Sequence, residues 1–159
     1  MNPTTEIAPV VKTIRVKAPI AHAFDVFTSG LTRWWPYNHG IGKKPIQKVM
    51  MEPRPAGRWL EISEDGTETT VATITLWDPP HRLVLLWQVN AKWQPDKSMK
   101  SEVDVRFTAE GPNATLVELK HHKFETMGAE AGASMRKDVD GGWPGLMERF
   151  AQEAERSGN

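Results

Sequence analysis

Six short segments with the composition of β-strands follow one another between residues 46 and 122, and they constrain the fold more than any other feature. The turns that separate them include PRPAG, EDG, DPP and GPN. In the segment 101–110 the apolar Val103 and Val105 alternate with the charged Asp104 and Arg106. Because consecutive strands joined by short turns pair as a meander, the sequence predicts an antiparallel sheet.

Helices are predicted on both sides of this run. Residues 10–18 alternate like a further strand, Pro19 then opens a short helix, and LTRWW (31–35) predicts a second short helix before Pro36. Residues 143–156 carry apolar side chains at the spacing of one helix face. That face needs a partner, and the concave side of a curved sheet is the available surface. The spacing gives no assignment for residues 125–142. We expect one domain over residues 10–156, after a disordered tail of residues 1–9.

Composition excludes several classes of function. Twenty Lys and Arg balance twenty Asp and Glu, which argues against a nucleic-acid partner, and the absence of cysteine removes disulfides and thiolate ligands. No apolar run approaches the roughly 20 residues of a membrane helix, and the first residues lack the core of a signal peptide. A cytoplasmic protein without a membrane partner is therefore expected, as a monomer or a dimer.

Six motifs in order over residues 12–155 resemble a known family. They read RVKAPIAHAFDVFT, LTRWWPY, EPRPAGRW, VATITLWDPPHRLVLLW, TLVELKHHKF and GGWPGLMERFAQ. Together they are similar to the activator of heat-shock protein 90 ATPase homologues, within the START-like SRPBCC superfamily. The resemblance implies an α+β helix-grip fold, in which a curved antiparallel sheet wraps around a long C-terminal helix and two short helices follow the first strand.

The resemblance also implies a cavity between the sheet and the long helix, which in the superfamily binds small hydrophobic or amphipathic molecules. The first functional hypothesis is therefore a small-molecule binding protein without a cofactor. One alternative is a protein that contacts a chaperone, as the family name suggests, although the eukaryotic co-chaperone uses a further domain for that contact. The other alternative is an enzyme of the cyclase or dehydratase type that acts in the cavity. The sequence leaves enzymatic activity open and favours binding.

Large side chains are expected around that cavity. Trp34 and Trp35 differ by about 100° around a helix, so one can pack inward while the other reaches the cavity mouth. Trp87 lies on the same strand face as Leu83 and Leu85. The expected lining residues are Trp34, Trp35, Tyr37, Trp59, Trp87, His121, Met147 and Phe150. An aromatic-filled core would produce the same sequence, so the size of the cavity stays open.

Two residues are candidates for acid–base chemistry. His121 shares a strand face with Val117 and Leu119, which makes it either a polar group in the pocket or a core histidine with a satisfied ring. Glu61 shares a face with Trp59, so it is a general-base candidate if that face looks inward and a solvated residue if Leu60 looks inward. No metal site is expected, because the adjacent His121 and His122 point to opposite faces of a strand.

Overall fold

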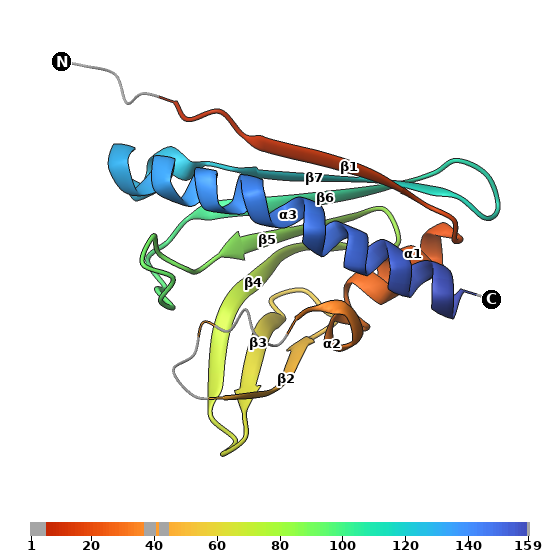
Figure 1. The fold of residues 1–159 in the computed structure, drawn as a ribbon, viewed down its shortest axis with the longest axis horizontal. Helices are drawn as coiled ribbons and strands as arrows, with labels where there is room; N and C mark the ends of the chain where they lie inside the picture. The colour runs from red at the N-terminus through yellow and green to blue at the C-terminus, as the bar shows by residue number, and fades with distance from the viewer. Residues whose placement is uncertain (1–5, 37–40, 42–44, 159) are drawn as a thin grey trace.

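The computed structural model describes residues 6–36, 41 and 45–158 and forms one curved sheet with a long helix across it (Figure 1). The elements in chain order are β1 (Val10–Val16), α1 (Ile20–Phe27), α2 (Leu31–Trp34), β2 (Ile46–Met51), β3 (Arg58–Ser63), β4 (Glu68–Asp78), β5 (Arg82–Trp87), β6 (Ser101–Ala109), β7 (Thr115–His122), the 3₁₀ helix η1 (Phe124–Met127) and α3 (Ala129–Ser157). This confirms the predicted α+β helix-grip arrangement, with two short helices after the first strand.

The seven strands lie in the order β1-β7-β6-β5-β4-β3-β2, and every neighbouring pair is antiparallel. Strands β2 to β7 form the predicted meander, and β1 joins its far edge by pairing with β7. Irregular register interrupts the β3–β4 pair beside Trp59 and the β4–β5 pair beyond Ile74. Such bulges bend a strand and increase its twist, which suits a sheet that curls around a helix.

Helix α3 begins at Ala129, fourteen residues before the start that the sequence pattern predicts at Trp143. The added residues include Gly141 and Gly142, and Pro144 lies inside the helix, where it removes one backbone donor. Burial compensates for these weak helix formers. The helix face that meets the sheet buries Met135, Val139, Trp143, Leu146, Met147, Phe150 and Ala154.

The expected tail, residues 1–9, falls partly outside the described residues. In its described part, the Ile7 amide donates to Glu125 Oε2 (3.4 Å), and the Arg136 guanidinium donates to the carbonyl of Ala8 (2.7 Å). These contacts hold residues 7–8 against η1 and α3. None of the described helices combines the length and the apolar character that crossing a membrane requires.

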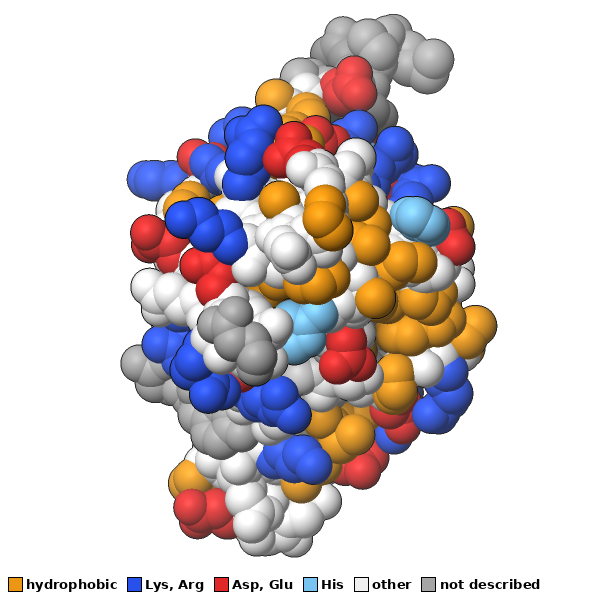
Figure 2. Space-filling model, turned by 90° about the vertical axis from the view of Figure 1, so that its right-hand side faces the viewer, with side chains coloured by type: hydrophobic (Ala, Val, Ile, Leu, Met, Phe, Trp, Pro, Cys, Tyr) orange, Lys and Arg blue, Asp and Glu red, His pale blue; other side chains and the backbone are white. Residues whose placement is uncertain are grey.

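Charged side chains of both signs are mixed over the surface, as the zero formal net charge requires. Figure 2 shows this mixture on the face that carries α1 and the C-terminus, together with a group of hydrophobic side chains. Leu76 on β4 is 36% exposed and Val11 on β1 is 49% exposed. Trp93 is exposed to a similar extent, at 37%, whereas Trp34, Trp59, Trp87 and Trp143 are buried.

Candidate functional site

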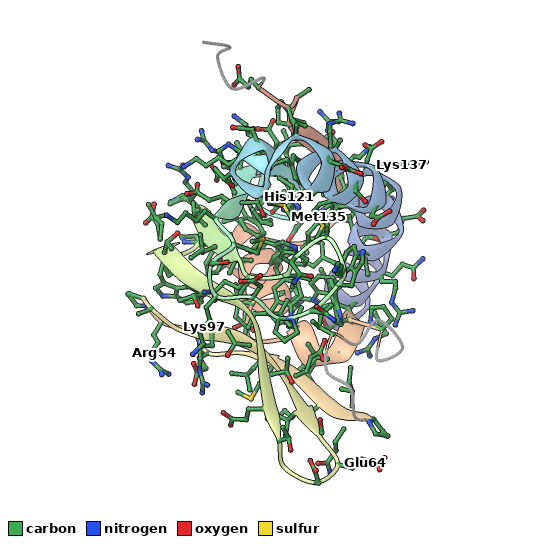
Figure 3. All side chains as sticks on the ribbon, turned by 90° about the vertical axis from the view of Figure 1, so that its left-hand side faces the viewer. Arg54, Glu64, Lys97, His121, Met135 and Lys137 are labelled. Carbon is green, nitrogen blue, oxygen red and sulfur yellow. The ribbon has the colours of Figure 1, made fainter. Side chains whose placement is uncertain are left out.

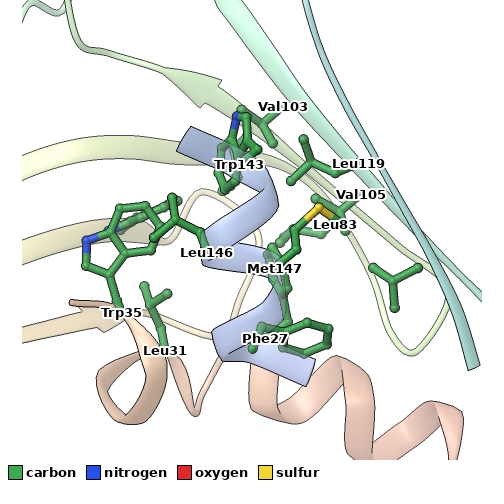
Figure 4. Packing of buried hydrophobic residues seen from close by; sticks show 14 of the residues in the cluster. Phe27, Leu31, Trp35, Leu83, Val103, Val105, Leu119, Trp143, Leu146 and Met147 are labelled. Atoms are coloured by element: carbon green, nitrogen blue, oxygen red, sulfur yellow. The ribbon is translucent and has the colours of Figure 1, made fainter. Parts of the chain in front are cut away.

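A cavity of about 320 Å³ lies between the sheet and the middle of α3. Strands β3, β4 and β5 supply one wall, α3 supplies the opposite wall, and the residue after α2 closes one side. The lining residues are Trp35, Ile41, Trp59, Glu61, Val71, Trp87, Trp93, Asp138, Val139, Gly142, Trp143 and Leu146. Figure 4 shows Trp35 and Leu146 beside one another, with Trp143 one turn earlier on α3. The cavity is therefore mostly aromatic and aliphatic.

Four indole rings form a closed circuit of contacts within the wall of this space. Trp35 contacts Trp59 with ring centroids 4.6 Å apart, and Trp59 contacts Trp87 at 5.6 Å. Trp143 completes the circuit, at 6.1 Å from Trp87 and 6.2 Å from Trp35. Three of these pairs meet edge to face, at 67° to 86°, and the Trp87–Trp143 pair is tilted at 59°, so none of the four stacks flat. The four rings together therefore make one continuous aromatic part of the cavity wall.

The two adjacent tryptophans of the LTRWW segment have different roles. Trp34 belongs to the core, where its Nε1 donates to the Val26 carbonyl (2.9 Å) and its ring packs against Phe150 at 5.6 Å. Trp35 lies at the end of α2 and lines the cavity. Phe150 and Met147, also expected at the cavity, are buried in the core and do not belong to its lining. Tyr37 lies outside the described residues.

Glu61 faces inward and is a carboxylate in the cavity wall. It is 2% exposed and follows Trp59 by two residues on β3, so the same strand face presents both. The backbone amide of Ile41 donates to both carboxylate oxygens, at 2.9 Å to Oε1 and 2.7 Å to Oε2. Leu60, the alternative inward residue, is also buried but does not belong to the main core cluster. Glu61 thus combines a position in the cavity with an anchoring contact to the chain at residue 41.

His121 lies behind the cavity wall and is fully buried. Trp143 Nε1 donates to its Nδ1 (3.2 Å), which leaves Nε2 as the protonated nitrogen, 3.4 Å from Ser101 Oγ. Burial, with a smaller contribution from the charge of His122, lowers the pKa of His121 to about 3. Figure 3 shows His121 in the interior, and its nearest ring neighbour is Phe124, with centroids 4.7 Å apart. This histidine is neutral near pH 7, supports the ring of Trp143 and does not line the cavity.

The sequence pattern did not predict the residues at the cavity mouth. Trp93, in the connection between β5 and β6, is 37% exposed and donates from Nε1 to Asp138 Oδ2 on α3 (3.0 Å). The polar surroundings of Trp93 gave no strand or helix signal, and Asp138 lies in the segment without an assignment. The one feature of the sequence that could have pointed to the cavity mouth was a tryptophan in an otherwise polar loop.

Two indole donors on the cavity wall have no hydrogen-bond partner within the described structure. They are Nε1 of Trp59 and Nε1 of Trp87, and both atoms are buried. An unsatisfied buried donor costs about 1–3 kcal/mol, so a pair of them in one place needs an explanation. Within the described residues, no group of three or more His, Asp or Glu side chains is arranged to hold a metal ion.

The whole chain resembles solved structures. The anthrahydroquino-gamma-pyrone synthase Txn09, solved in complex with SUM, is 38% identical with a TM-score of 0.64, over 95% of this chain and 99% of that chain. CalC, a self-sacrificing resistance protein from Micromonospora echinospora, is 33% identical with a TM-score of 0.73, over 94% of this chain and 96% of that chain.

The Aha1 dimer from Colwellia psychrerythraea has a TM-score of 0.64 over 94% of this chain and 97% of that chain. The sequences are 14% identical, so this similarity is one of fold alone. Comparison with curated proteins found no match. Residues 17–155 match the family described as Activator of Hsp90 ATPase homolog 1-like protein. The resemblance noted in the sequence is thereby confirmed, and the chain belongs to this START-like family.

Proposed function

We propose that this protein binds a small planar aromatic molecule in the cavity between the sheet and α3. The observation that carries the proposal is the closed circuit of four contacting indole rings in the wall of a cavity of about 320 Å³. Pockets for small molecules are mostly apolar, with a few polar groups that fix orientation. Here Glu61 on the wall and the Trp93–Asp138 pair at the mouth supply those polar groups.

The charge of the cavity narrows the ligand class. Its described lining includes the acidic residues Glu61 and Asp138 and contains no Lys or Arg. An anionic ligand would meet a carboxylate in a space of low dielectric, which is unfavourable. A neutral aromatic ligand fits this arrangement. The similarity to Txn09, an anthrahydroquino-gamma-pyrone synthase, supports an aromatic ligand by analogy.

Chemistry in the cavity, of the cyclase type, is the second candidate. Glu61 favours it, because a buried carboxylate next to an aromatic ligand can accept a proton from an acidic C–H or O–H group. His121 gives no support as its acid partner, because it is neutral and lies behind Trp143. The chaperone-associated alternative rests on the family name and on a likeness at 14% identity.

Native mass spectrometry of the protein purified from its own cells tests the binding proposal. We expect a mass increment from a co-purified aromatic compound, with an absorption band above 300 nm after release by denaturation (roughly the region beyond tryptophan absorption). A mass equal to that of the bare chain, together with unchanged tryptophan fluorescence across a panel of neutral aromatic compounds, would contradict the proposal. Turnover of a released compound by the protein would favour the cyclase candidate over simple binding.

A further inference from the structure

The described opening of the cavity lies between two side chains. Among the described lining residues only Trp93 and Asp138 are exposed, and the others are buried or half-buried. Trp93 belongs to the connection between β5 and β6, and Asp138 belongs to α3, so they reach the opening from different elements. A hydrogen bond from Trp93 Nε1 to Asp138 Oδ2, at 3.0 Å, joins them. A molecule that enters between these elements must therefore pass this contact.

The turn that carries Trp93 has hydrogen bonds of its own. The Asn90 amide donates to the Gln94 carbonyl and the Trp93 amide donates to the Asn90 carbonyl, both at 2.9 Å. The side-chain oxygen of Asn90 accepts from the amides of Lys92 and Gln94, at 3.0 and 3.1 Å. None of these bonds uses the Trp93 indole. The indole can therefore leave Asp138 while the backbone of the turn keeps its shape.

The backbone of Trp93 has an unusual conformation for so large a residue. Its φ is 57°, in the left-handed region, where glycine is the usual residue and a bulky side chain is rare. A residue held in this region costs free energy, and such residues occur preferentially at ligand clamps and switch regions. Because glycine would form the same turn more easily, this conformation indicates that the indole itself has a role at the opening.

We propose that the Trp93 side chain is the gate of the cavity. The gate is closed while Nε1 donates to Asp138, and it opens when this hydrogen bond breaks and the indole turns away from α3. This inference rests on the proposed function and specifies how a ligand reaches that same cavity. Both partners are exposed, so water can replace the bond on each of them and the open state stays accessible. Because the same bond closes the free and the occupied cavity, the gate governs the rates of entry and exit more than the affinity.

Stopped-flow tryptophan fluorescence with 9-fluorenone, a neutral planar aromatic compound, tests the gate. Asp138→Ala removes the acceptor and leaves the indole in place. The closed form of the free protein and that of the complex both lose the same hydrogen bond. We therefore expect kon and koff to rise by the same factor, about fivefold, the effect of one net hydrogen bond. A side chain that only contacts the bound ligand would change koff alone.

Two further substitutions on α3 show whether the effect belongs to the acceptor. Asp138→Asn keeps a side-chain oxygen that can accept but removes its charge, so we expect rates between those of the wild-type protein and Asp138→Ala. Asp140→Ala is the matched control. It removes a carboxylate that pairs with Lys12 (2.8 Å) and does not belong to the cavity lining, so it should leave both rates unchanged.

Trp93→Gly removes the gate itself. Glycine suits a φ of 57°, so the turn should keep its shape and the variant should fold. We expect kon to rise at least as much as in Asp138→Ala, because the ligand no longer waits for the gate to open. Addition of Asp138→Ala to Trp93→Gly should then change neither rate further, since the two residues act through one contact.

The outcomes separate the gate from the binding site. Unchanged rates in Asp138→Ala and Trp93→Gly would overturn the gate and leave aromatic binding in the cavity intact. A higher koff with an unchanged kon in both variants would identify a contact to the bound ligand, which also overturns the gate. If 9-fluorenone binds neither to the wild-type protein nor to Trp93→Gly, the proposed function is overturned and the inference with it.

Discussion

Trp143 on α3 donates its indole N–H to Nδ1 of His121 on β7, at 3.2 Å, across the interface between helix and sheet. Trp143 is one of the four rings of the cavity circuit, and His121 is the buried group directly behind it. Ser101 on β6 in turn accepts from the other ring nitrogen of His121. The orientation of a cavity wall is therefore fixed by hydrogen bonds that the ligand does not touch.

Replacement of His121 should lower the stability of the folded protein. His121→Ala leaves a space in the core and leaves the Trp143 N–H without an acceptor, so we expect a loss of about 2–4 kcal/mol in the free energy of unfolding. His121→Asn keeps an acceptor near the Nδ1 position and should lose less. Urea denaturation of the two variants measures the difference. Equal losses would show that the hydrogen bond to Trp143 contributes little.

The buried imidazole also predicts a dependence of stability on pH. Its pKa falls from 6.5 to about 3 in the folded chain, so the unfolded chain binds a proton first as the pH drops. The contribution of neutral His121 to the free energy of unfolding is fully present above pH 6.5. It is lost between pH 6.5 and 3, at up to about 1.4 kcal/mol per pH unit.

Carboxylates titrate in the same range, so the informative quantity is the difference between the wild-type protein and His121→Asn. We expect the stability advantage of the wild-type protein to shrink from pH 7 to pH 4.5. The measurement is denaturation at several pH values in that interval. Parallel pH profiles for the two proteins would contradict a buried neutral His121.

The hydrogen bonds of Glu61 to the Ile41 amide also predict a contribution of this residue to stability. Glu61→Gln keeps the shape and one acceptor oxygen for the Ile41 amide but removes the charge that strengthens this hydrogen bond. We expect a loss of about 0.5–1.5 kcal/mol in the free energy of unfolding. Glu64→Gln is the matched control, because Glu64 is exposed after the end of the same strand (Figure 3). An equal effect of both substitutions in chemical denaturation would show that the Ile41 contact contributes no stability.

The strands of the fold were predictable because local signals agree with the tertiary structure. Alternation and turn residues placed β6 over 101–110, where the structure has Ser101–Ala109. The first half of α3 was not predictable in the same way. Gly141, Gly142 and Pro144 oppose helix formation locally, and the burial of Met135 and Val139 against other elements outweighs them. Tertiary packing of this kind leaves little trace in local propensity.

The candidate site, too, was predictable from the sequence only in part. Counting by twos placed His121 on the inward face of its strand, but it could not show that Trp143 lies between His121 and the cavity. The inward direction of Glu61 was undecidable from alternation, because Trp59, Leu60 and Glu61 are all buried beside the irregular β3–β4 register. The contact between Trp93 and Asp138 joins segments 45 residues apart, and no local pattern encodes it.

The most direct test of aromatic binding in the cavity uses two glycines of α3. An added Cβ would meet no atom within 4 Å at Gly142, which lines the cavity, or at the exposed Gly141 beside it. Gly142→Leu therefore fills the cavity, and Gly141→Leu is its matched control. Both changes favour the helix by about 0.8 kcal/mol, so neither should lower the melting temperature.

Calorimetric titration with 9-fluorenone should give the same Kd for the wild-type protein and Gly141→Leu, and a Kd at least about tenfold higher for Gly142→Leu (a loss of ~1.4 kcal/mol or more). Equal Kd values for the two leucine variants would contradict binding in the tryptophan-lined cavity.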